Sequence, residues 1–203
     1  MHPSSDTTGG LAMRAAFTVL DFETTGSVPG WPVEPWQIGL VGIAGGRLQP
    51  APYESLLRVD PGRPFNRHAP GRHARLRAAL ADAPSLGDLW PFLAADWLLN
   101  RPLVAHNIGT ERSLLQRAAP LHRLGPWIDT LRLVRRTYPR LASAALDDVV
   151  GELGLEQALQ AACPGRVPHD ALYDATACAL LLLHCLALPG WERVTVQALV
   201  DLD

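Results

Sequence analysis

Lysine is absent from this chain of 203 residues, and all 18 of its basic residues are arginines. The 20 acidic residues give a formal net charge of −2, which excludes a strongly basic protein that binds nucleic acid through its overall charge. Many arginines fall in two stretches, Arg58–Arg77 and Arg132–Arg140. Either stretch alone is typical of a solvated face, whereas both on one side of the molecule would form a track for phosphate groups.

Cysteine is also scarce, with Cys163, Cys178 and Cys185 forming no CxxC pair and no disulfide framework. This usage indicates a reducing compartment. The first dozen residues lack the pattern of a secretory signal, and we expect residues 1–14 to be a flexible tail. The most apolar stretch, residues 179–188, is about half as long as a membrane span requires. We therefore expect a cytoplasmic protein with no membrane partner.

Apolar residues make up 48% of the chain, enough for one folded domain, which we place at residues 15–203. Three strands come first and are joined closely enough to be antiparallel. Helices and short strands alternate afterwards, which predicts a mixed α/β sheet whose later strands are parallel and whose faces are covered by helices. The expected strands are 17–22, a second that starts at 36 and ends at a hairpin turn at Ala-Gly-Gly (44–46), 53–59, 102–107 and 127–129. The expected helices are 83–100, 110–119, 130–138, 146–155 and 169–188. We expect residues 60–75 to form a loop.

Two carboxylates stand side by side at the end of the first strand. Asp21 and Glu23 are two residues apart, so they point to the same face of that strand. Like charges this close repel each other, and their burial without a partner is costly. A bound cation would remove this cost.

Two further acids occupy positions that suggest a site. Glu111 lies in the first turn of the helix after strand 102–107, at the sheet edge where open α/β proteins build their sites. Taken alone, it is explained by the helix dipole. Asp174 lies among apolar residues of the last long helix and needs a partner. His169 can converge with it only from the loop before that helix, which an N-cap at Asp170 favours.

The order of these residues resembles the three motifs of the DEDD superfamily of exonucleases. The stretches "DFETTG" (21–26), "VAHN" with the acid that follows, and "HDALYD" (169–174) carry the resemblance, which spans roughly residues 15–188. The histidine of the third motif is similar to that of the histidine subclass, the DNA polymerase III epsilon-like and ribonuclease T-like group. The tyrosine subclass would place tyrosine at position 170, where this chain has aspartate. The resemblance implies a ribonuclease H-like α/β fold.

The second motif departs from the family pattern at two positions. The family has aspartate where this chain has Glu111, and phenylalanine where it has Thr110. Glutamate is longer by one methylene group and can still hold a cation, directly or through water. The alternative is a second metal that binds weakly or not at all.

The resemblance implies a chemistry for these residues. Asp21, Glu23, Glu111 and Asp174 would hold two Mg²⁺ or Mn²⁺ ions, and His169 would act as the general base. The reaction would release nucleoside 5′-monophosphates from single-stranded 3′ ends, as in proofreading or DNA repair. Contacts to the terminal nucleotide are expected from the first and second motifs: Phe22, Thr24, Thr25, Gly26, His106 and Asn107. For His106 and Asn107, hydrogen bonds behind the site are the alternative.

Other functions and partners remain open at this stage. The fold could serve as a non-catalytic module that binds nucleic-acid ends, or as a phosphoesterase for small nucleotides. The partners would be DNA or RNA 3′ ends, with a DNA polymerase or a second copy of the chain as further candidates. Trp31 and Trp36 could stack on bases or anchor their proline-rich loop.

Overall fold

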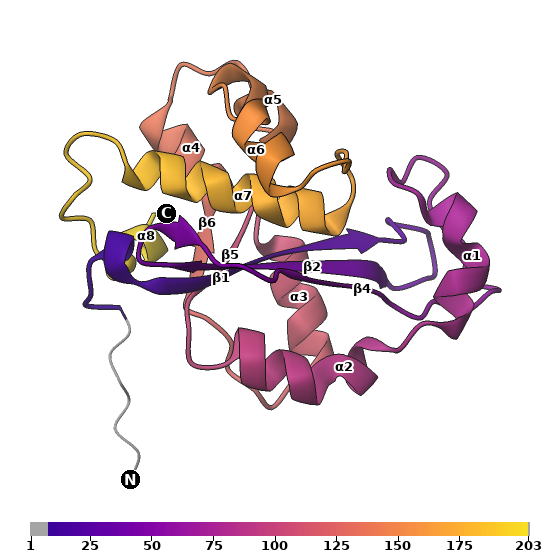
Figure 1. Cartoon of the computed structure of the whole chain (residues 1–203). Coiled ribbons are helices and arrows are strands. Elements are labelled where there is room, and N and C mark those ends of the chain that lie inside the picture. The colour runs from indigo at the N-terminus through magenta and orange to yellow at the C-terminus, as the bar shows by residue number, and fades with distance from the viewer. Residues whose placement is uncertain (1–7, 203) are drawn as a thin grey trace, which may run out of the picture.

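The computed structural model describes residues 8–202 as a sheet between two layers of helices (Figure 1). The strands are β1 (Ala16–Thr24), β2 (Pro35–Ala44), β3 (Arg47–Leu48), β4 (Tyr53–Leu56), β5 (Leu103–Ala105) and β6 (Trp127–Asp129). The α-helices are α1 (His73–Asp82), α2 (Leu86–Leu93), α3 (Gly109–Ala118), α4 (Thr130–Thr137), α5 (Leu146–Glu152), α6 (Glu156–Ala162), α7 (Ala171–Leu186) and α8 (Val196–Val200). The chain also forms a 3₁₀ turn, η1 (Ala12–Arg14), and a π-helical turn, η2 (Ala94–Leu98).

The sheet is mixed, as the sequence predicts. Its strand order is β3-β2-β1-β5-β6, and β4 also pairs with β2. Strands β1 and β2 are antiparallel, and so are the pairs that β2 forms with β3 and β4. Strands β1, β5 and β6 run parallel. The carboxyl ends of these three strands therefore meet at one edge, which is where the acidic residues are carried.

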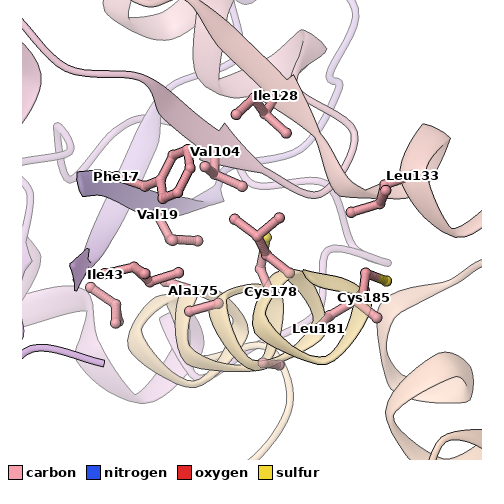
Figure 2. Close-up of a cluster of buried hydrophobic side chains, with 14 of the residues drawn as sticks. Phe17, Val19, Ile43, Val104, Ile128, Leu133, Ala175, Cys178, Leu181 and Cys185 are labelled. Atoms are coloured by element: carbon pink, nitrogen blue, oxygen red, sulfur yellow. The ribbon is translucent and has the colours of Figure 1, made fainter. Parts of the chain in front are cut away.

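Helices cover both faces of the sheet, and the residues of β1 and β2 are therefore buried on both sides. Helix α7 lies along one face with α4, α5 and α6 behind it, while α2 and α3 lie on the other face (Figure 1). Figure 2 shows the cluster under α7, in which Phe17 and Val19 of β1 meet Ala175 and Cys178. All three cysteines are buried and reduced, so they contribute apolar volume to this layer.

A glycine sets how closely α7 approaches the sheet. Gly39 of β2 pairs with Asp21 of β1, and the start of α7 crosses directly over it. A Cβ atom at position 39 would lie 2.3 Å from the backbone carbon of Ala171. No side chain fits into this space, so glycine permits the contact.

Two helix starts form as the sequence predicts. Ser85 and Asp88 form a reciprocal capping box at α2. Asp129 caps α4 by accepting a hydrogen bond from the N–H of Leu131 at 2.9 Å. The single helix expected over 83–100 is instead α2 followed by the π-helical turn η2, with Pro91 inside α2. Proline lacks an N–H donor, which weakens regular hydrogen bonding at that point.

Two expectations about chain segments need correction. The loop expected over 60–75 ends at residue 72, where α1 begins. The tail expected over 1–14 is wrong for residues 8–14, because Leu11 bridges to Thr195 and the Ala12 N–H donates to Val194 O at 2.8 Å. Residues 1–7 lie outside the described part of the chain. These backbone hydrogen bonds join the start of the chain to the segment that leads into α8.

The two arginine-rich stretches do not form one track. Helix α1, from the first stretch, and helix α4, from the second, lie on opposite sides of the molecule in Figure 1. The first stretch therefore has to be considered alone. Within residues 8–202, no helix has both the length and the apolar character that a bilayer crossing requires.

Candidate active site

Four carboxylates from three elements meet at the sheet edge. Asp21 and Glu23 come from β1, Glu111 from the first turn of α3, and Asp174 from the first turn of α7. Burial raises the pKa of Asp21 well above its ordinary value, and the negative charges of Asp174, Glu111 and Glu23 raise it further. Asp21 is therefore the member of the group that senses all three others.

His169 joins two of these acids. One ligand atom from each of Glu23, His169 and Asp174 lies within 4.8 Å of the other two. Burial raises the pKa of Glu23 to about 7. Burial and then the charge of Glu23 raise the pKa of Asp174 to about 8. The protein alone does not stabilise these negative charges, so the cluster favours either protons or a cation.

The backbone at His169 is held in an unusual conformation. Its φ of 63° is left-handed, which is uncommon for a residue other than glycine. The His169 N–H donates to Asp174 Oδ2 at 3.1 Å, so the same acid that lies near the ring also fixes the backbone. The expected convergence of His169 and Asp174 from a loop before the helix is what the structure shows.

The surroundings of Glu111 are those that best fit a bound cation. Its side chain is 4% exposed, and Oε2 has no hydrogen-bond partner within the described residues. Burial raises its pKa to about 7. A buried carboxylate oxygen without a donor costs free energy, and a hard cation is the ligand that such an oxygen accepts best. The donor set of this site therefore fits Mg²⁺ or Mn²⁺.

Asp170 anchors the loop that carries His169. Its side chain is 1% exposed and caps α7 by accepting from the Leu172 N–H at 3.2 Å. It also forms ion pairs with Arg72 and with Arg166, the latter at 2.8 Å. The sequence indicates the cap but not the ion pairs, because Arg72 lies 98 residues away along the chain.

A pocket of about 330 Å³ opens beside the acids. Expected residues line one side of it, together with Thr110: Phe22, Glu23, Thr24, Gly26 and Glu111. The other side comes from the loop before α1, which sequence reasoning did not assign to the site: Asn66, His68, Ala69 and Pro70. The only signal for this loop in the sequence is its arginine content.

Three residues expected to contact substrate have different surroundings. Thr25 is fully buried, and its Oγ1 accepts from the Glu34 N–H at 3.1 Å, so its side chain supports the pocket wall from behind. The two ring nitrogens of His106 hydrogen-bond to Thr130 Oγ1 and Ala144 O, which matches the alternative of a bond behind the site. Asn107 is exposed, and its backbone N–H donates to Asp129 Oδ1 at 2.9 Å.

A buried arginine ties together the two loops of the pocket wall. Arg63 is 2% exposed and donates to Thr25 Oγ1 at 3.2 Å and to Pro32 O. Its guanidinium lies 5.0 Å from the ring centroid of Trp31, which is 49% exposed. Trp36 is fully buried and donates from Nε1 to Thr24 O, so this tryptophan anchors the loop.

Comparison with known proteins places this geometry in a family. The family model described as Exonuclease matches residues 18–182. Exodeoxyribonuclease 10 of Escherichia coli strain K12 is 30% identical over 187 residues, which cover 91% of this chain and 73% of that protein. The solved structure of Exonuclease X in complex with 5′ overhanging duplex DNA has a TM-score of 0.65 and 28% identity, covering 92% of this chain and 98% of that one.

A polymerase contains a similar segment. The PolC-type DNA polymerase III of Thermotoga maritima is 34% identical over 205 residues, which cover 98% of this chain but 14% of the polymerase. The family match covers most of the described residues and includes all four carboxylates and His169. This chain belongs to the Exonuclease family.

Proposed function

We propose that this exonuclease removes nucleoside 5′-monophosphates one at a time from the 3′ end of a single strand. The reaction would use two divalent cations, held by Asp21, Glu23, Glu111 and Asp174, with His169 as general base. The observation that carries the proposal is the partnerless, buried Oε2 of Glu111 within a group of carboxylates whose pKa values are raised.

The metals would supply charge compensation for the attacking and leaving oxygens and an acidified water. Glu23 and Asp174, whose ligand atoms lie within 4.8 Å of each other, would hold a cation together. Asp21 and Glu111, whose charges interact, would complete the set of carboxylate ligands.

His169 would take the proton from the attacking water. A general base must reach its proton directly or through one water, and His169 lies within 4.8 Å of two of the acids. The Asp170 ion pairs and the hydrogen bond to Asp174 would keep the ring near the reacting phosphate. This is positioning, which lowers the entropic cost of reaching the transition state.

The pocket would hold the terminal nucleotide. Gly26 has φ of 68° and lines the pocket, and a Cβ atom there would lie 2.8 Å from Asn66 Cβ, so glycine lets the two loops of the pocket wall meet. The similarity to a PolC-type polymerase supports, as a further part of the proposal, action at 3′ ends made by a polymerase.

The test follows 5′-labelled single-stranded DNA and RNA with purified protein in Mg²⁺, Mn²⁺ or EDTA. Asp21→Ala is the inactive variant, and Asp148→Ala, an exposed acid of α5, is the matched control. We expect a ladder that shortens from the 3′ end with the unaltered protein and the control. The ladder should be absent with EDTA and with Asp21→Ala.

Other results would change the proposal. Oligonucleotide binding without any cleavage would indicate an end-binding module, and equal cleavage by the Asp21→Ala protein would refute the site. Cleavage of dinucleotides alone would indicate a phosphoesterase for small nucleotides.

A further inference from the structure

The first arginine-rich stretch contains two arginines that form no contact with a distant part of the described chain. Four of its six side chains do form contacts beyond their sequence neighbours: Arg58 with Asp88, Arg63 with Thr25 and Pro32, Arg72 with Asp170, and Arg77 with Arg63 O and the ring of Phe65. Arg67 and Arg75 remain exposed. Neither forms an ion pair with any residue of the range 8–202.

Arg67 stands between two residues that line the pocket. Its neighbours Asn66 and His68 both line the pocket, and its Nε donates to His68 Nε2 at 2.8 Å. The Asn66 N–H bonds to Thr25 O at 2.8 Å, and Asn66 Nδ2 bonds to Ser27 O at 2.7 Å. The loop that presents Arg67 is therefore fixed to the loop after β1.

Arg75 lies one helical turn beyond a residue that reaches the catalytic loop. Arg72 is the N-cap residue of α1, and its carbonyl oxygen accepts from the Arg75 N–H, so the two residues are neighbours at the start of the helix. Arg72 reaches Asp170 beside His169. The chain before α1 passes close to the acids. A Cβ atom at Gly71 would lie 3.1 Å from His169 O and 3.4 Å from Glu23 Oε2.

The net charge of the chain bears on what these arginines can bind. The chain as a whole has a net charge of −2, so its overall charge does not attract a polyanionic strand. Local positive charge along the path of the strand is needed to hold its phosphates. An unpaired arginine next to the pocket supplies that charge, and each phosphate it neutralises also releases counterions.

We propose that Arg67 and Arg75 bind phosphates of the nucleotides that precede the scissile one, so that the strand leaves the pocket along the start of α1. This inference rests on the proposed function and deepens it. It assigns the protein a substrate several nucleotides long, not a free mono- or dinucleotide. Helix α4, which carries the arginines of the second stretch up to Arg136, lies on the opposite side of the molecule in Figure 1, away from this path.

The test is the salt dependence of binding. A labelled single-stranded oligonucleotide is titrated with the Asp21→Ala protein, which prevents cleavage, in Mg²⁺ at several salt concentrations. Each phosphate contact to a single strand contributes about −0.7 to the slope of log Kobs against log[salt]. Adding Arg67→Gln and Arg75→Gln should therefore make the slope shallower by about 1.4. The control pair is Arg136→Gln in α4 and Arg140→Gln, three residues after that helix; both residues are exposed, and the pair should leave the slope unchanged.

A kinetic readout separates contact from structure. With Asp21 intact, the Arg67→Gln and Arg75→Gln double variant should show a raised KM for a long oligonucleotide and an unchanged kcat. Its KM for a dinucleotide without a 5′ phosphate should stay as it is, because that substrate has no phosphate before the scissile one. Both arginines are exposed, so the melting temperature should not change.

Two results would overturn the proposal. An unchanged slope in the double variant would show that these arginines do not contact the phosphates of the strand, and an equal loss in the control pair would show only a general effect of charge. If the protein neither binds nor cleaves any oligonucleotide, the proposed function fails, and this surface fails with it.

Discussion

Glu111 should destabilise the metal-free protein at neutral and alkaline pH, and replacing it with glutamine should remove that effect. Its pKa rises from the ordinary value of 4.5 to about 7 because the side chain is buried. A folded-state pKa above the unfolded value means that the folded chain binds the proton more tightly. Glu111 therefore makes its full favourable contribution to the free energy of unfolding below pH 4.5, and this contribution is lost as pH rises through about 7.

The size of the effect follows from the difference between the two pKa values. It corresponds to about 3 kcal/mol at about pH 8 and to less than about 1 kcal/mol at about pH 5. For a domain of this length, 1 kcal/mol changes the melting temperature by about 2–4 °C. The buried amide of Glu111→Gln has a cost of its own, about 1–3 kcal/mol, but that cost does not depend on pH. The difference between the two pH values isolates the charge.

The assay is thermal unfolding followed by circular dichroism in EDTA. At each pH, the melting temperature of the wild type is subtracted from that of Glu111→Gln. This difference should be more positive at about pH 8 than at about pH 5 by about 5–10 °C. Glu152→Gln, an exposed glutamate of α5, is the control and should show no such change. Added Mn²⁺ should raise the melting temperature of the wild type more than that of Glu111→Gln. A stability difference that is the same at both pH values would refute the reasoning.

Three further predictions concern the site. Asp21→Ala should abolish cleavage while far-UV circular dichroism shows an intact fold, and in EDTA its melting temperature should equal or exceed that of the wild type because a repelled charge is gone; cleavage at the wild-type rate would contradict this. His169→Ala should lower the rate about 10²–10⁴-fold and flatten the rise of rate with pH, and an unaltered pH–rate curve would exclude it as the base. Arg63→Met should raise KM more than it lowers kcat, because the two loops of the pocket wall lose their link. Steady-state kinetics with an oligonucleotide checks the split, and equal KM values would limit Arg63 to stability.

Local signals account for the parts of the fold that the sequence predicts. Hydrophobic runs, turns and caps indicate the strands and most helices, and Asp129 and Ser85 form the caps that their positions suggest. Helix α1 was missed because it follows a segment rich in proline and glycine, and of its residues only Leu80 is fully buried. Its stability comes from packing against Trp36 and Val59, which a local pattern does not reveal.

The candidate site, like the fold, could be predicted from the sequence only in part. The spacing of the acids predicts their convergence, since each stands at the end of a strand or the start of a helix. The hydrogen bonds around His106 and the ion pairs of Asp170 could not be predicted, because their partners lie far away along the chain. The loop with Asn66 and His68 was missed because nothing local marks it as part of a pocket. Contacts between distant segments are a property of the fold as a whole.

Gly39 shows what it would take to move this site elsewhere. It carries no functional group, yet it sets the depth at which α7 rests on the sheet, and with it the separation between Asp174 and the two acids of β1. A comparison that scores only the acids and the histidine would accept a relative with a larger residue at this position. In such a relative α7 would have to lift away from β2, and the same side chains would no longer converge. A designer who transplants the site into another scaffold must therefore copy the glycine together with the carboxylates.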